Sequence, residues 1–249
     1  MSYRFAKKIG YLLKSRHRRG HGIHSPFLFR LITEVIENKG SFSAYPALTS
    51  ARENVEDMLR ILDMNSFQKE DDSSEKHRSI HFKRLHLLPD RFDRLLLRLV
   101  NDFRPRDISF YGSTFGVSVL ALALADSRIR VNAQVENSHY RSFCRRLVEV
   151  FELGNVDLTG AGKVTATDFV VVQYPLNPGC CDRIVNDILT VDDYDGVVVL
   201  CGIHFSPAMQ EVWLRQCENK VVRISLDLFD IGILMCKKGL QKEDFVLRF

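Results

Sequence analysis

Residues 107–116, read Asp-Ile-Ser-Phe-Tyr-Gly-Ser-Thr-Phe-Gly, constrain the fold more than any other part of the chain. They begin as a β-prone segment and reach two glycines four residues apart, Gly112 and Gly116, before the apolar run 117–125. A strand, a glycine-containing loop and a helix in this order open many α/β domains that bind a phosphate or a nucleoside at the loop. The stretch therefore predicts the first unit of a doubly wound α/β sheet.

The chain after this unit alternates between strand-like and helix-like patterns. Strands are expected at 108–111, 130–135, 156–159, 168–173 and 196–201, and helices at 117–125, 138–153, 180–189 and 207–217. Such alternation predicts parallel strands with helices on both faces. The last two strand-like runs, 220–228 and 231–237, are separated by only two residues, which predicts an antiparallel hairpin at the sheet edge. We expect a mostly parallel seven-stranded sheet with a C-terminal β-hairpin.

An N-terminal helical appendage is expected before this domain. Apolar spacing predicts helices at 3–14 and 49–62, and Ser25-Pro26 is a typical helix start with Ser as N-cap. Residues 68–79 contain charged residues and no apolar one, so they are expected to form an exposed loop. We therefore expect the appendage over residues 1–80 and the α/β domain over residues 81–249.

Composition and charge limit the possible environments. No apolar run is long enough to span a bilayer, and the first thirty residues lack a cleavable hydrophobic segment, so a cytoplasmic location is expected. The six cysteines lack metal-site spacing and are expected to be reduced thiols. Eight Lys and Arg residues precede the first acidic residue, Glu34. Such a block can contact nucleic acid, anionic lipid or an acidic partner, or can form a solvated basic helix and loop.

Four stretches resemble a family of class I S-adenosylmethionine-dependent methyltransferases from Bacteroidetes-type bacteria. They are Arg19-Gly20-His21-Gly22-Ile23-His24-Ser25-Pro26-Phe27-Leu28-Phe29, Leu97-Arg98-Leu99-Val100, Gly202-Ile203-His204-Phe205-Ser206 and Leu226-Asp227-Leu228-Phe229-Asp230-Ile231-Gly232. The resemblance covers nearly the whole chain, and the HGIHSPF motif is its most specific part. It implies a Rossmann-like class I methyltransferase fold, with this chain as a divergent member, and S-adenosylmethionine as cofactor. It does not identify the methyl acceptor.

The resemblance also implies a cofactor site. Gly112, Ser113 and Gly116 match the loop whose backbone approaches the methionine and ribose of the cofactor, where glycine permits a close approach. Phe110 replaces the acidic residue that ends the first strand in the family. Glu136 stands where the second strand ends in a carboxylate that accepts the ribose hydroxyls. A glutamate at a strand end is also common for solvation alone, so both interpretations stay open.

The chain departs from the family at the fourth and fifth strands. Related O-methyltransferases have acidic residues there that can hold a divalent cation, whereas this chain has Gln173, Cys201 and Gly202. No metal site is therefore expected, and any methyl transfer is expected to be metal-independent. The connection of residues 160–168 is also too short for a crossover helix, so part of the adenine-side wall is expected to be missing.

Two functions remain open from the sequence. In an active methyltransferase, His204 is the candidate base and Gln173 the candidate substrate-orienting group, since His204 follows the fifth strand at the carboxyl edge. The alternative is a catalytically degenerate methyltransferase-fold protein that binds a ligand or partner. His21 and His24 either join His204 near the cleft or hydrogen-bond their local turns. The basic N-terminus is a candidate RNA-binding arm for either version.

Overall fold

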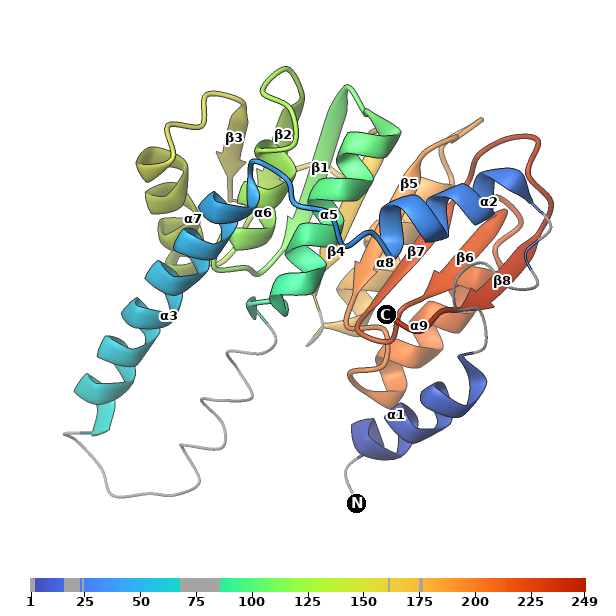
Figure 1. Ribbon diagram of the computed structural model, residues 1–249, viewed down its shortest axis with the longest axis horizontal. Helices are drawn as coiled ribbons and strands as arrows, with labels where there is room; N and C mark the ends of the chain where they lie inside the picture. Colours follow the sequence, from blue (N-terminus) through green and yellow to red (C-terminus); the bar gives the residue numbers. More distant parts are fainter. Residues whose placement is uncertain (1–2, 16–22, 24, 68–85, 161, 175–176) are drawn as a thin grey trace.

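The computed structural model of the protein describes residues 3–15, 23, 25–67, 86–160, 162–174 and 177–249 (Figure 1). The helices are α1 (Tyr3–Lys14), α2 (Pro26–Arg30), the π-helix η2 (Leu31–Ile36), α3 (Tyr45–Phe67), α5 (Asp90–Phe103), α6 (Val117–Ala123), α7 (Ser138–Val150), α8 (Pro178–Leu189) and α9 (Pro207–Glu218). The strands are β1 (Asp107–Gly112), β2 (Arg130–Gln134), β3 (Val156–Thr159), β4 (Phe169–Gln173), β5 (Val197–Cys201), β6 (Ile224–Asp227), β7 (Ile231–Met235) and β8 (Glu243–Val246).

The strands form one sheet in the order β3-β2-β1-β4-β5-β7-β6-β8. Strands β1 to β5 pair in parallel, as the alternating pattern predicts. Strand β7 is antiparallel to both β5 and β6, which confirms the predicted hairpin, but β7 lies inside the sheet. The prediction of seven strands is wrong, because β8 pairs in parallel with β6 as an eighth strand. It was missed because it is only four residues long and begins with two charged residues, Glu243 and Asp244.

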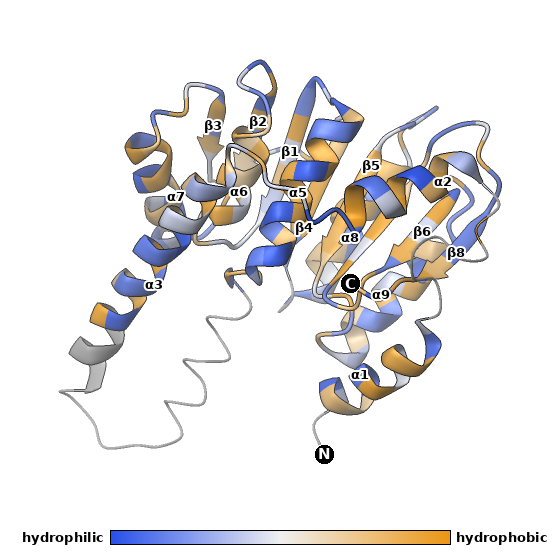
Figure 2. Cartoon of the chain, in the orientation of Figure 1, coloured by the Kyte–Doolittle hydropathy of each residue, from blue (hydrophilic) through white to orange (hydrophobic). Residues whose placement is uncertain are grey.

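The two faces of the sheet bury separate hydrophobic clusters. Along β4, Phe169 and Val171 belong to the cluster formed with α3, α5, α6 and α7, whereas Val170 and Val172 belong to the cluster formed with α8 and α9. This alternation is the two-residue period of a strand covered on both faces. Figure 2 shows these central strands coloured as hydrophobic.

The described part of the predicted appendage shares the first of these clusters with the sheet, through α2, η2 and α3. Helix α2 begins at Ser25-Pro26 as predicted, and the Ser25 side chain accepts a hydrogen bond from the Leu28 main-chain N–H. The predicted boundary near residue 80, the exposed loop at 68–79 and the HGIHSPF histidines His21 and His24 lie outside the described residues. The division into two domains therefore stays a prediction. No helix in the described ranges is both long enough and apolar enough to cross a membrane.

Two buried polar side chains of α5 connect it to the N-terminal helices. Arg98 donates hydrogen bonds to the main-chain oxygens of Val35, at 2.7 Å, and Ile36, at 3.1 Å, at the end of η2. Asp93 has no solvent exposure and pairs with Arg52 of α3 at 2.7 Å. The Ser118 hydroxyl also donates to Asp93, at 2.8 Å. These contacts satisfy polar groups that would be costly to bury without partners.

The loop after β1 is packed tightly against the rest of the fold. Gly112 has a φ of +151°, and a Cβ placed there would lie 2.3 Å from the Gln173 main-chain oxygen. Gly116 has a φ of +99°, and a Cβ there would lie 3.0 Å from the Cys144 Cα atom of α7. The contacts within the protein thus require glycine at both positions, before any bound ligand is considered.

We predict that the stability difference between the wild type and Asp93→Asn depends on pH. Burial raises the pKa of the Asp93 carboxyl to about 6, against the opposing effects of Arg52 and Ser118. Because this folded-state pKa lies above the unfolded value, ionisation of Asp93 costs stability as pH rises from about 4 to about 7. Over that range, the unfolding free energy of the wild type should fall relative to the variant by on the order of 3 kcal/mol.

Urea unfolding of both proteins at several pH values measures this difference. The other carboxylates are common to the two proteins, so their contributions cancel in the comparison. The titration of buried Asp93 is contradicted if the unfolding free energy of the wild type minus that of Asp93→Asn stays constant or increases as pH rises.

A second prediction concerns Gly116. Gly116→Ala is expected to lower the unfolding free energy by about 2 to 4 kcal/mol, because it combines a left-handed φ with a clash against α7. Gly154→Ala is the matched control, since a Cβ at Gly154 meets nothing within 4 Å. The control should change stability by less than about 1 kcal/mol. Equal thermal unfolding midpoints for the two variants would argue against the packing role of Gly116.

Candidate functional site

The candidate site lies at the carboxyl edge of the sheet, where β1 and β4 end side by side. The chain order reverses at this point, since β1 has β2 on one side and β4 on the other. Open α/β sheets bind ligands in the crevice outside the strand ends at such a switch point. The Ser113 main-chain N–H donates to the Gln173 main-chain oxygen at 3.1 Å and so joins the loop after β1 to the end of β4.

Aromatic side chains cover the glycine loop. The His86 ring stacks on Tyr140 with ring centroids 4.5 Å apart, and Phe115 meets Tyr140 edge-on at 5.2 Å. His86 Nδ1 lies 3.1 Å from the Ser113 main-chain oxygen. Burial lowers the pKa of the His86 imidazole, and the hydrogen bond to Ser113 opposes that shift. Within residues 111–116, Ser113 is partly exposed and the other five residues are buried, so the loop offers a small accessible surface. The sequence pattern gave no indication that His86 or Tyr140 would lie here.

Glu136 is exposed directly after β2, as its position in the sequence predicts. The Arg141 guanidinium donates to the main-chain oxygens of Val135, at 2.8 Å, and Glu136, at 3.0 Å, and holds this turn in place. Burial raises the pKa of the Tyr174 phenol, and the Glu136 carboxylate raises it further through its charge and a side-chain hydrogen bond. Tyr174 follows β4, so this contact brings the ends of two strands together. Sequence reasoning missed Tyr174.

Gln173 and Cys201 end β4 and β5, and both side chains are buried. Gln173 has 0% exposure and Cys201 has 1%, so neither side chain is presented to solvent in this conformation. Burial raises the pKa of the Cys201 thiol well above its ordinary range, which keeps it uncharged. Residues 160 and 162–168, between β3 and β4, contain no helix, as the short connection predicts. The role of Gln173 as a substrate-orienting group stays a prediction.

His204 forms a dyad with Asp227. Its Nε2 atom lies 2.7 Å from Asp227 Oδ2, and the other carboxylate oxygen, Oδ1, accepts the Phe229 main-chain N–H at 2.8 Å. His204 Nδ1 is buried and has no hydrogen-bond partner in the described part of the chain. The dyad joins the loop after β5 to the end of β6, and both lie at the carboxyl edge of the sheet. Asp227 belongs to one of the motifs noted in the sequence, but its pairing with His204 was not predicted.

Among the described residues, no group of three or more His, Cys, Asp or Glu side chains could hold a metal ion. Asp193 is an exposed turn residue that pairs with Lys238 at 2.9 Å. Trp213 is 3% exposed and lies against Gly232 in the core.

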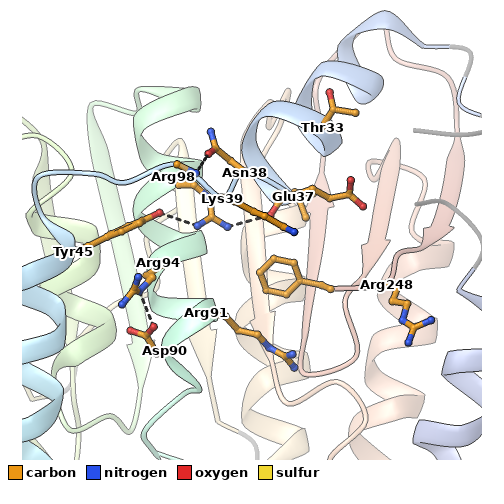
Figure 3. A pocket seen from close by; sticks show the side chains of 13 residues that line it. Thr33, Glu37, Asn38, Lys39, Tyr45, Asp90, Arg91, Arg94, Arg98 and Arg248 are labelled. Carbon is orange, nitrogen blue, oxygen red and sulfur yellow. Dashed lines mark hydrogen bonds and ion pairs between the residues drawn. The ribbon is translucent and has the colours of Figure 1, made fainter. Parts of the chain in front are cut away.

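A separate cleft of about 1050 Å³ lies between η2, α5 and residues 248–249 (Figure 3). Four arginines line it: Arg91, Arg94, Arg98 and Arg248. Three of them have structural partners, since Arg98 binds the end of η2, Arg94 pairs with Asp90 at 2.6 Å and Arg91 pairs with Asp230 at 3.4 Å. None of the lining residues belongs to the loops after β1, β2 or β4. The cleft is therefore distinct from the site at the switch point.

Comparison by sequence identifies no relative. No protein-family model matches the chain, and no curated protein matches it.

Solved structures match over most of the chain. A methyltransferase of Podospora anserina with bound S-adenosylhomocysteine (SAH) aligns at a TM-score of 0.57 and 12% identity, over 86% of this chain and 96% of that chain. An O-methyltransferase of Bacillus cereus in complex with SAH aligns at 0.52 and 15%, over 84% and 97%. TomG of Streptomyces achromogenes, an O-methyltransferase of tomaymycin synthesis in complex with S-adenosylmethionine (SAM), aligns at 0.51 and 17%, over 68% and 91%. The chain thus has the Rossmann-like fold of these methyltransferases, with an additional edge strand, β8, beyond the seven that its sequence predicts.

Proposed function

We propose that the protein is a SAM-dependent methyltransferase-like protein whose cofactor site lies at the carboxyl edge of the sheet, at Ser113 and Glu136. The observation that carries the proposal is the exposed Glu136 carboxylate at the end of β2, beside the switch point of a fold whose solved examples contain SAM or SAH. The Bacteroidetes-type family of the sequence resemblance, its cytoplasmic location and an unidentified methyl acceptor are part of the same proposal.

The residues at this edge of the sheet fit the ribose of the cofactor, at the end of β2, better than they fit the part of the cofactor at the end of β1. Glu136 is exposed and can accept the two ribose hydroxyls, and charge-assisted hydrogen bonds of this kind are among the stronger ones. Ser113 is the accessible residue of the glycine loop. Phe110 is fully buried, so it contributes no polar contact at the end of β1. The cofactor would therefore be held mainly through its ribose.

The His204–Asp227 dyad supplies the acid–base chemistry of the proposal. Bound SAM would supply an electrophilic methyl group. Asp227 holds the Nε2 side of the imidazole, which leaves Nδ1 to take a proton from an acceptor hydroxyl or amine. Nδ1 is buried, so the acceptor would have to displace the side chains that cover it. Asp227 is itself fixed by the Phe229 N–H, so it is a positioning residue for His204. The remaining contribution of the chain is to orient the acceptor.

The alternative proposal is a catalytically degenerate protein that binds a ligand or partner. It is favoured by the burial of Gln173 and Cys201, which removes polar side chains from two strand ends where related enzymes carry acidic groups. It is also favoured by the glycines of the loop, whose presence the internal packing explains. Binding of SAH without methyl transfer, or no binding, distinguishes this alternative from the first proposal.

Isothermal titration of the full chain with SAH tests the cofactor site. We expect Glu136→Ala to weaken SAH binding by about 10- to 100-fold, the value of a hydrogen bond to a charged group. Glu149→Ala is the matched control, since Glu149 is an exposed glutamate near the C-terminal end of α7, whereas Glu136 directly precedes the start of that helix. Tyr174→Phe should weaken binding less, because it removes only the phenolic hydroxyl that contacts Glu136.

The same titration separates the two halves of the proposed site. His204→Gln should bind SAH as the wild type does, because we assign His204 to the acceptor side. Undetectable binding of SAH to the wild type at millimolar concentration would sink the enzyme proposal and leave the partner-binding alternative. Equal affinities of the wild type and Glu136→Ala would remove the ribose role of Glu136.

A further inference from the structure

Helix α1 directs its apolar stripe away from the protein. Phe5, Ile9, Leu12 and Leu13 fall at i, i+4, i+7 and i+8 and therefore share one face of the helix. Their exposed fractions are 54%, 43%, 42% and 75%. They are four of the nine large apolar side chains that are exposed in the described part of the chain. The apolar stripe of a surface helix ordinarily faces the core, so this orientation is reversed.

The opposite, polar face attaches α1 to the body of the protein. The buried Tyr11 hydroxyl donates to the Leu247 main-chain oxygen, and the Tyr11 ring lies 5.1 Å from that of Phe229. Arg4 forms an ion pair with Asp230 beside the hairpin. The Tyr3 hydroxyl donates to Gln210 of α9, next to which α1 lies at the lower right of Figure 1. Rotating the helix to bury its apolar stripe would break these contacts.

The charge of α1 is entirely positive. The helix carries Arg4, Lys7, Lys8 and Lys14 and no acidic residue, and the first acidic residue of the chain is Glu34. Arg4 is paired with Asp230, whereas Lys8 and Lys14 are exposed. Lys8 lies one turn before Leu12 and therefore beside the apolar stripe. An exposed apolar face bordered by an exposed lysine, on a helix whose charges are all positive, combines the two features of a helix that lies in a membrane interface.

The charges and the apolar stripe of α1 together favour one class of partner. A second copy of the chain would bring two wholly basic helices together, which like-charge repulsion opposes. Nucleic acid would attract the lysines, but its phosphates offer nothing to aliphatic side chains such as Ile9 and Leu13. We propose that α1 docks the protein on the surface of an anionic lipid bilayer, with the stripe at the level of the headgroups, Lys8 on lipid phosphates and the other basic charges of the helix attracting the anionic surface. The contact is peripheral and is independent of the proposed cofactor site.

Co-sedimentation of the full chain with lipid vesicles tests this docking. The wild type should pellet with vesicles that contain phosphatidylglycerol and phosphatidylcholine, and much less with phosphatidylcholine alone. Ile9→Ser combined with Leu13→Ser should lower the binding constant by about tenfold or more, because two apolar side chains no longer enter the interface. Lys8→Glu combined with Lys14→Glu should lower it by a similar factor, and added salt should weaken wild-type binding.

The matched control is Ile61→Ser combined with Val150→Ser. Both side chains are 58% exposed and lie on other helices, so this variant should bind vesicles as the wild type does. Thermal unfolding of all variants checks that the fold is retained. The proposal is overturned if the wild type does not pellet with anionic vesicles, or if the α1 and control variants bind equally. It is also overturned if Ile9→Ser with Leu13→Ser instead abolishes a dimer seen by light scattering, or binding to a single-stranded RNA in a filter assay.

Discussion

The close main-chain contact between the ends of β1 and β4 is the constraint on which the arrangement of this protein depends. Gly112 approaches the Gln173 carbonyl so closely that no side chain fits between them. The adjacent Ser113 N–H donates to that same carbonyl. Because β1 to β5 run in parallel, the loops after them lie at one edge of the sheet, and the chain order reverses there between β1 and β4. The positions of Glu136, Tyr174 and His204 follow from that convergence.

This contact gives the glycines of the loop after β1 a structural role that does not depend on a ligand. A glycine-containing loop after the first strand is commonly taken as a sign of a bound nucleoside, because glycine admits a ligand close to the backbone. Here the same residues are required by β4 and α7. Function is therefore indicated by side chains that the fold does not need for packing. These are the exposed carboxylate of Glu136, whose partner is Tyr174, and the His204–Asp227 dyad.

Much of the fold could be predicted because its strands carry strong local patterns. Strands such as β4 and β5 are uninterrupted apolar runs, and such runs between helical segments indicate parallel strands buried on both faces. Strand β8 could not be predicted, since its sequence Glu-Asp-Phe-Val is stabilised as a strand only by pairing with β6. For the site, Glu136 was predictable from its place after a strand. Tyr174 was not, because its contact with Glu136 joins segments nearly forty residues apart.

The sequence by itself determined the α/β class, the order of the elements, the hairpin of β6 and β7 and the helix start at Ser25, since these depend on local periodicity and capping. Only the tertiary structure decided which side chains meet. It placed His204 on Asp227, buried Gln173, and covered the glycine loop with His86. It also decided that α1 faces outward with its apolar stripe. An amphipathic pattern specifies that a helix has two faces, but the partners available at the docking surface determine which face is buried.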